Sequence, residues 1–319
     1  MGPSDGRRDA STVSPAEAFG ALSNETRIQI LRALSDAGRP LSFSELRGRV
    51  GVRHGGKFNY HLDKLVGHFV DKVDAGYTLC QPGDWVVQAI RSGTLTGGPT
   101  VDPAEVDLAC ARCEVPLEVR YRHGAVRVSC PACRGTDETA TVRRPEREVD
   151  HGTVAVLPLP PAGVQGRTAM DILRAAATWA HLDALAVASG VCPTCSAAVE
   201  RFVRVCEAHD AVEGRCDRCG RHPAVCVEFR CANCTDGRVF DAVTALLYTP
   251  ELLAFVKDHG LDPTADVVEW SWDYSAEVRS TDPVELRFVF ALDGEELTLT
   301  VDGDLSVVDV TRRDDSEVA

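Results

Sequence analysis

The chain has 319 residues and a formal net charge of −14, with 34 basic and 48 acidic side chains. This length is enough for two or more domains, each with its own core. No apolar run approaches the ~20 residues needed to cross a bilayer, and the polar segment 1–10 lacks the apolar centre of a signal peptide. We therefore expect a soluble, cytoplasmic protein without membrane partners.

The charge is unevenly distributed along the chain. Residues 1–100 contain 12 basic and 10 acidic side chains, a balance of +2, and the remainder contains 22 and 38, a balance of −16. A DNA-binding segment should be the least acidic part of an acidic chain, which is the case here. The excess of arginine over lysine fits a salt-rich cytoplasm, or simply a GC-rich genome.

The first hundred residues contain three helix-start signals. Segments 14–17 (SPAE) and 42–45 (SFSE) are capping boxes, the first with proline at the first helical position. Asn24 can cap the helix between them, and Gly38 and Gly51 are natural stops.

A fourth helix is predicted over residues 56–69. Its apolar positions follow the helical period and face a core: Phe58, Leu62, Leu65 and Phe69. A second face carries two cations, a phenol ring and an imidazole: Lys57, Tyr60, His61 and Lys64. Asn59 lies beside this face, where it could reach a base or a phosphate, and we count it among the DNA-binding residues. A recognition helix presents such a surface to the major groove.

A β-hairpin is predicted next, with strands 70–73 and 77–79 and the turn 74–76, followed by a short helix over 85–90. Helix, helix, turn, helix and hairpin is the order of a winged helix-turn-helix. We expect the second face of the fourth helix to enter the major groove, and Arg53 and Lys72 to bind phosphates. An ordinary solvated helix face is the alternative. A core position for His61 is also possible, although its place opposite Phe58 and Leu62 argues against it.

The stretches 19–27 (FGALSNETR) and 57–65 (KFNYHLDKL) resemble ArsR-type winged-helix regulators, most closely those of salt-loving archaea. The resemblance spans residues 17–79, about a fifth of the chain. It implies a dimeric, cytoplasmic DNA-binding protein. Founding members sense metals through a Cys-x-Cys pair in the helix before the recognition helix. Here that helix, 44–50, has no cysteine, so metal sensing by that route is not supported.

Five Cys-x-x-Cys pairs follow, and in a cytoplasmic protein they indicate metal rather than disulfides. Each pair offers two thiolates to one tetrahedral ion. One zinc ribbon is predicted from Cys110, Cys113, Cys130 and Cys133, because the alternating segments 115–121 and 126–128 form a hairpin between the two pairs.

Two further sites are predicted downstream. One comprises Cys216, Cys219, Cys231 and Cys234, and the other comprises Cys192, Cys195, Cys206 and His209. A competing assignment joins Cys192 and Cys195 to a neighbouring pair and leaves Cys206 and His209 free. We prefer three sites and expect two to three structural zinc ions, because full coordination leaves no open position for catalysis. Thioredoxin-like and iron–sulfur spacings do not fit.

The overall prediction is an α+β protein with a winged helix-turn-helix domain (1–95), a zinc ribbon (105–145) and an α+β domain with two inserted zinc knuckle sites (150–319). Within the last domain we expect a strand over 152–159 and helices over 168–188, 239–247 and 250–259. An antiparallel meander should follow, including Trp270, Trp272 and Tyr274 and the segments 286–292, 296–301 and 305–310. Residues 312–319 are expected to be disordered.

These features together predict a sequence-specific, homodimeric transcription regulator that binds double-stranded DNA. A protein-interaction module that docks on the transcription machinery is one alternative, and a sensor whose cysteine sites respond to metal or oxidant is another. No nucleophile elbow, P-loop, dinucleotide fingerprint or HExxH motif occurs, so we do not expect an enzyme.

Overall fold

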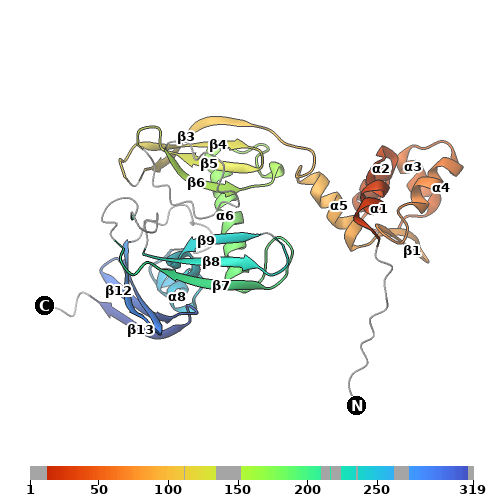
Figure 1. Cartoon of the computed structure of the whole chain (residues 1–319). Helices are drawn as coiled ribbons and strands as arrows, with labels where there is room; N and C mark the ends of the chain where they lie inside the picture. The colour runs from red at the N-terminus through yellow and green to blue at the C-terminus, as the bar shows by residue number, and fades with distance from the viewer. Residues whose placement is uncertain are drawn as a thin grey trace, which may run out of the picture. The chain divides into compact units, whose positions relative to one another are not determined.

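The computed structural model describes residues 13–110, 112–133, 152–209, 216, 224–234, 236–261 and 273–314. Within these ranges the protein is α+β, with helices and four antiparallel sheets. It divides into two compact units, Met1–Thr96 and Gly97–Ala319 (Figure 1). The predicted boundary between segments 105–145 and 150–319 does not separate compact units, because strands from both segments share one sheet.

The first unit contains the helices and the hairpin expected from its capping signals. Both capping boxes are formed, since the side chains of Glu17 and Glu45 return to the N-cap backbone. Gly38 and Gly51 end their helices with positive φ, as expected for glycine at these positions. The elements are α1 (Pro15–Leu22), α2 (Glu25–Ala37), α3 (Phe43–Val50), α4 (Gly55–Asp63), β1 (Val70–Val73), β2 (Gly76–Leu79) and α5 (Gln81–Arg91).

Helix α4 is shorter than predicted, ending at Asp63 instead of residue 69. The chain turns through Gly67, which has φ of 86° and whose N–H donates to the carbonyl of Val70. Leu65 and Phe69 nevertheless pack in the core of the unit, because the turn keeps them on the same side as α4's apolar face. Leu65 and Phe69 therefore keep the spacing of a helical apolar face although they lie after the end of α4.

The second unit begins with a four-stranded antiparallel sheet of order β3-β4-β5-β6, comprising β3 (Val101–Ala109), β4 (Pro116–Arg122), β5 (Ala125–Ser129) and β6 (Thr153–Pro158). A 3-10 turn, Pro161–Gly163, leads to α6 (Ala169–Ala188), which matches the predicted helix over 168–188 and is capped by the side chain of Thr168. The buried side of this sheet, including Val119 and Tyr121, packs against Ile172 and Leu173 of α6.

The rest of the unit is built on two more sheets. One is three-stranded, of order β7-β8-β9, with β7 (Val199–Val205), β8 (Val225–Cys231) and β9 (Gly237–Asp241). The other is the expected meander of β10 (Asp273–Thr281), β11 (Val284–Leu292), β12 (Glu295–Asp302) and β13 (Val307–Asp314). The short α7 (Ala242–Leu246) and α8 (Pro250–Asp258) complete a core shared by both sheets.

Helix α6 joins the two halves of this unit (Figure 1). Ile172 and Leu173, near its start, belong to the core of the β3–β6 sheet. Ala184 and Val187, near its end, belong to the core that the other two sheets share. A single continuous helix is therefore part of both cores.

Three predictions for the second unit need comment. Residues 239–241 extend as strand β9 instead of helix, because they pair with β8. Of the predicted disordered residues 312–319, residues 312–314 continue strand β13, and residues 315–319 lie outside the described residues. Trp270 and Trp272 lie outside the described residues, and only Tyr274 of that row is placed, in β10. No helix in the described ranges is both long and apolar enough to cross a bilayer.

Candidate functional site

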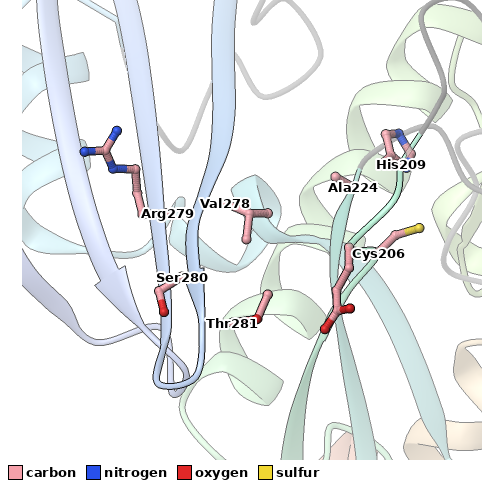
Figure 2. A pocket seen from close by; sticks show the side chains of 8 residues that line it. Cys206, His209, Ala224, Val278, Arg279, Ser280 and Thr281 are labelled. Atoms are coloured by element: carbon pink, nitrogen blue, oxygen red, sulfur yellow. The ribbon is translucent and has the colours of Figure 1, made fainter.

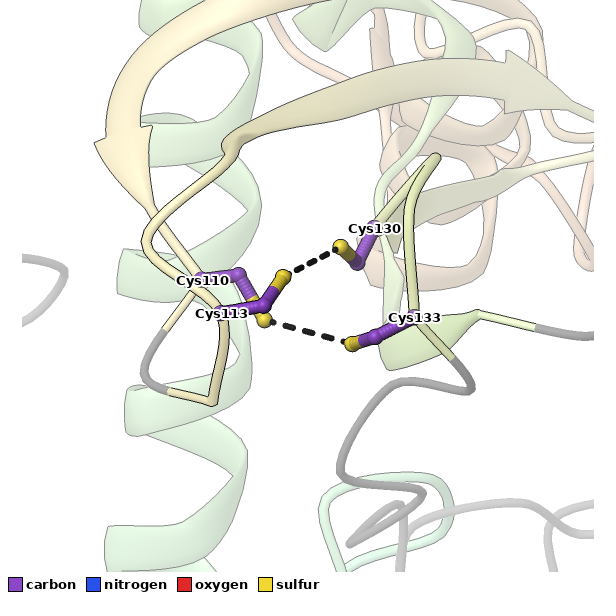
Figure 3. A group of neighbouring side chains, drawn as sticks. All are labelled: Cys110, Cys113, Cys130 and Cys133. Carbon is purple, nitrogen blue, oxygen red and sulfur yellow. Dashed lines mark hydrogen bonds between the residues drawn. The ribbon is translucent and has the colours of Figure 1, made fainter.

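The first candidate metal site is the cluster of Cys110, Cys113, Cys130 and Cys133, whose four sulfurs all lie within 4.8 Å of one another (Figure 3). The Sγ atoms of Cys110 and Cys133 are 3.7 Å apart, and those of Cys113 and Cys130 are 3.4 Å apart. A tetrahedral zinc ion with Zn–S bonds of about 2.3 Å separates its sulfurs by about 3.8 Å. The predicted grouping is confirmed, and the donor set fits structural zinc.

The strands explain how these four sulfurs meet. Cys110 directly follows β3 and Cys130 directly follows β5. Because both strands are antiparallel to β4, which lies between them, their C-terminal ends lie at the same end of the sheet. The first knuckle closes through Glu114, whose φ is 59° and whose N–H donates to the carbonyl of Cys110. Gly152 supports the second knuckle, since its carbonyl accepts a 2.7 Å hydrogen bond from the N–H of Cys130.

The second cluster comprises Cys192, Cys195, Cys231 and Cys234, again with all sulfurs within 4.8 Å. The Sγ–Sγ distances are 3.8 Å for Cys192 and Cys234 and 3.4 Å for Cys195 and Cys231. This grouping corrects our preferred assignment, which joined Cys192 and Cys195 to Cys206 and His209. The competing assignment, which joined Cys192 and Cys195 to a neighbouring pair of cysteines, was right about these two residues.

Hydrogen bonds prepare the second cluster for a metal. The N–H of Ala197 lowers the pKa of the Cys195 thiol most, followed by the side chain of Asn233 and the thiol of Cys231, to about 6. The backbone N–H groups of Asn233 and Cys234 both donate to the sulfur of Cys231 at 3.3 Å. A thiolate is the form that binds metal, so these donors favour the ligating state of Cys195 and Cys231. The backbone N–H of Asp236 lowers the pKa of Cys234, but burial and the three neighbouring thiols outweigh it and raise that pKa to about 12.

A buried polar network next to the second cluster was not predicted. The Asp236 carboxylate lies 3.8 Å from Cys192 Sγ and accepts a 2.7 Å hydrogen bond from the Thr194 hydroxyl. Arg238 lies 3.6 Å from the same carboxylate and 2.8 Å from Asp183 on α6. Because Thr194 belongs to the 192–195 knuckle, its bond to Asp236 holds this knuckle, and with it two of the ligands, in place. No spacing rule identifies them, because the contacts join α6, the 192–195 knuckle and the start of β9.

A third cluster comprises Cys206, His209 and Cys216, whose possible ligand atoms also lie within 4.8 Å of one another. The Sγ atoms of Cys206 and Cys216 are 4.0 Å apart. Cys206 and His209 therefore have a metal-ligating neighbour, contrary to the competing assignment, and Cys216 is not joined to Cys231 and Cys234 as preferred. Cys219 lies outside the described residues.

The register of the β7–β8 hairpin accounts for the second and third clusters together. Val199 pairs with Cys231 at one end of the hairpin, and Val205 pairs with Val225 at the other. Residues just before β7 therefore meet residues at the end of β8, which gives the second cluster. Residues just after β7 meet residues before β8, which gives the third cluster.

The face of α4 proposed to meet DNA is largely exposed. Tyr60 is 59% exposed, and the ammonium of Lys64 lies 5.9 Å from the centre of its ring. Lys57 and Asn59 are exposed as well, although the Asn59 amide donates a 2.7 Å hydrogen bond to Asp63. Arg53, before the helix, and Lys72, on β1, are also exposed.

His61 corrects the predicted face, because its side chain is buried with only 7% exposure. Burial, together with the charges of Arg27 and Lys57, lowers the pKa of its imidazole. Its Nδ1 has no hydrogen-bond partner within the described part of the chain. The ring is a core residue of the helix and does not face a DNA groove. Its spacing of three residues from Phe58 and four from Leu65 places it beside the apolar face of the helix, and not opposite that face as we expected.

The fold and these clusters define a two-unit α+β protein with cysteine-rich sites suited to metal ions. A family model described as a domain of unknown function, DUF7351, matches residues 107–307, and the chain therefore belongs to this family. A second model, the domain of unknown function DUF7347, matches residues 15–90, within the first unit. No curated protein and no solved structure matches the chain.

Proposed function

We propose that the chain is a sequence-specific DNA-binding transcription regulator whose second unit is stabilised by structural zinc. The observation that carries the proposal is the exposed face of α4, with Lys57, Tyr60 and Lys64. This face belongs to a unit whose element order is that of a winged helix-turn-helix, with the β1–β2 hairpin as the wing. The major groove is wide enough to admit such a helix.

The start of α4 adds a second reason. His54 is the N-cap residue but makes no side-chain cap, and the first turn contains no acidic residue. Arg47 of α3 lies against Gly55, where an added Cβ would be 3.1 Å from its guanidinium. Uncapped N–H groups and nearby cations favour a backbone phosphate at a helix start. Tyr60 would then read base edges between one and two turns further along, and Lys64, just after the helix, would bind a backbone phosphate.

Zinc is the ion that the cysteine clusters favour. Four thiolates at tetrahedral spacing are typical of structural zinc sites, and full coordination excludes a reacting substrate from the ion. The β4–β5 hairpin between the knuckles of the first cluster supports its assignment as a zinc ribbon. In this proposal the zinc ions maintain the second unit, and the first unit binds DNA.

Replacing Lys64 or Lys72 by alanine should weaken binding to all DNA sequences. Each substitution removes about one phosphate contact, so the slope of log K against log salt should flatten by about one unit. Filter binding at several salt concentrations measures this slope. Lys257→Ala is the matched control, since this lysine lies on α8 in the second unit. Unchanged slopes for Lys64→Ala and Lys72→Ala would remove these contacts from the proposal.

Footprinting on genomic fragments tests the proposal as a whole. A protected site whose sequence changes when Tyr60 is replaced supports sequence reading by α4. No protection on any fragment, combined with retention of RNA polymerase on the immobilised protein, would favour a docking module for the transcription machinery instead.

We also propose a homodimer formed through the first unit. Several large apolar side chains of this unit are exposed, and the three most exposed are Phe19 on α1 at 73%, Leu95 at 67% and Trp85 on α5 at 62%. Contact with a second copy would cover them, and a two-fold dimer matches two half-sites on DNA.

Trp85→Glu should therefore convert the dimer into a monomer, because a carboxylate would be buried at the contact. Light scattering coupled to size-exclusion chromatography measures the mass. Trp179→Glu is the control, since this tryptophan is 46% exposed on α6 in the second unit. Dissociation by the control alone would place the dimer contact in the second unit and contradict the proposal.

A further inference from the structure

We propose that Arg238 is a positioning residue of the second cluster, which fixes the Asp236 carboxylate between the two pairs of cysteines and anchors it to Asp183 on α6. The inference rests on the metal binding proposed above and does not depend on DNA binding. It gives three charged side chains an influence on how strongly one ion is bound, although none of them is a ligand.

Asp236 contacts both pairs of ligands in the second cluster. Its backbone carbonyl accepts a 2.9 Å hydrogen bond from the N–H of Cys231, a ligand of one pair. Its carboxylate accepts the 2.7 Å bond from Thr194, which lies between the ligands of the other pair, and is 3.8 Å from the sulfur of Cys192. A tetrahedral zinc site needs its sulfurs about 3.8 Å apart. The place of Asp236 therefore helps to set the separation of the two pairs.

Arg238 connects Asp236 to helix α6. Its guanidinium lies 3.6 Å from the Asp236 carboxylate and donates a 2.8 Å hydrogen bond to the carboxylate of Asp183. The three side chains are largely buried, with 14% exposure for Arg238, 17% for Asp183 and 3% for Asp236. Ala184 and Val187 pack this end of α6 into the core. Asp183 therefore gives Arg238 a fixed anchor.

The charges around the second cluster explain why a cation is needed there. A zinc ion with four thiolates carries a net negative charge, and the Asp236 carboxylate lies beside one of these sulfurs. Like charges repel strongly in the protein interior, because the surroundings screen them little. Arg238 supplies the opposite charge between Asp236 and Asp183. Without this cation Asp236 would be driven away from the cluster, and its bond to Thr194 would be strained or lost.

The third cluster has different surroundings, at the opposite end of the β7–β8 hairpin. There Cys206 and His209 line one wall of a cavity of about 490 Å³, and residues 278–281 of β10 line the opposite wall (Figure 2). The first cluster follows strands β3 and β5 of another sheet. The link through Arg238 to α6 belongs to the second cluster, so we expect a substitution of Arg238 to weaken the binding of one ion per chain.

The test measures metal affinity of the full-length, zinc-loaded protein by competition with a coloured chelator. Arg238→Met keeps the side-chain length but removes the charge, and it should weaken the binding of one ion per chain about tenfold. Arg238→Lys keeps the charge and should regain part of this loss. Arg230→Met is the matched control and should behave as wild type. Arg230 lies beside the ligand Cys231, but its side chain is 56% exposed and pairs with Glu228.

A double-mutant cycle separates positioning from a general loss of stability. Asp236→Asn removes the negative charge and keeps an oxygen that can accept the Thr194 bond. In this background Arg238→Met should weaken binding much less than in wild type, because no carboxylate beside the cluster needs the cation. A general loss of stability would weaken the binding of every ion equally in both backgrounds.

The inference is overturned if Arg238→Met binds all its ions as wild type does, if Arg238→Lys regains none of the loss, or if the loss is the same in the Asp236→Asn background. The zinc content of wild type is measured first. Wild type without zinc would contradict the proposed metal sites and this inference with them. A zinc-loaded wild type with an unchanged Arg238→Met variant would overturn the inference alone.

Discussion

Removing all metal should unfold the second unit and leave the first unit folded. All three clusters lie between residues 110 and 234, in the second unit. Each fully coordinated zinc ion contributes on the order of 10 kcal/mol to folding, which is comparable to the whole stability of a domain. The first unit has its own core around Ile30, Leu46 and Phe58 and needs no ion.

Prolonged chelation followed by far-ultraviolet circular dichroism and limited proteolysis measures this effect. The β signal should fall, and a fragment close to residues 13–96 should resist the protease. Addition of zinc should restore the signal. Cys80→Ser is the control, because Cys80 belongs to none of the three clusters and should not change the response. A second unit that keeps its signal after its metal content has fallen to zero would show that zinc is not structural.

Gly152→Ala should abolish metal binding at the first cluster. Gly152 has φ of 86°, and an added Cβ would lie only 2.3 Å from the carbonyl oxygen of Cys130. Because Cys130 also donates its N–H to Gly152, the clash would displace the ligand itself. We expect a cost of about 3 kcal/mol and the loss of one ion per chain. Metal analysis and thermal unfolding measure the two quantities.

Gly124→Ala separates this clash from simple backbone strain. Gly124 has φ of 79° on the β4–β5 turn, and an added Cβ would meet nothing within 4 Å. It should cost about 1 to 2 kcal/mol and leave the metal content unchanged. Equal metal loss in both variants would mean that the sheet, and not the contact with Cys130, determines binding at the first cluster.

The first unit was predictable from sequence because its signals are local. Capping boxes at Ser14 and Ser42 and stops at Gly38 and Gly51 involve residues close together in the chain, and all are present. The end of α4 was not predictable, because Leu65 and Phe69 keep helical spacing through a turn. The burial of His61 could have been predicted, because its spacing from Phe58 and Leu65 places it beside the apolar face of the helix.

The metal sites were predictable in composition but not in grouping. All but one of the predicted ligands lie in a cluster, and Cys219 lies outside the described residues. The partners of Cys192 and Cys206 depend on the pairing of β7 with β8 across 19 intervening residues, 206–224. Closeness in sequence favoured the wrong grouping. Recognising segments 199–205 and 225–231 as one hairpin would have indicated the observed grouping, with one cluster at each end of the hairpin. Strand β9 was missed because it too forms by pairing with β8.

One metal site lies at each end of the β7–β8 hairpin, so the length of the hairpin sets the distance between the two sites. Seven residues in each strand span about 20 Å, and the side of the sheet on which a side chain projects reverses with every residue. Deleting one residue from either strand would turn the ligands at one end away from their ion. An insertion or deletion can therefore preserve both sites only if each strand gains or loses two residues together. This requirement restricts how the length of the hairpin can vary among members of the family.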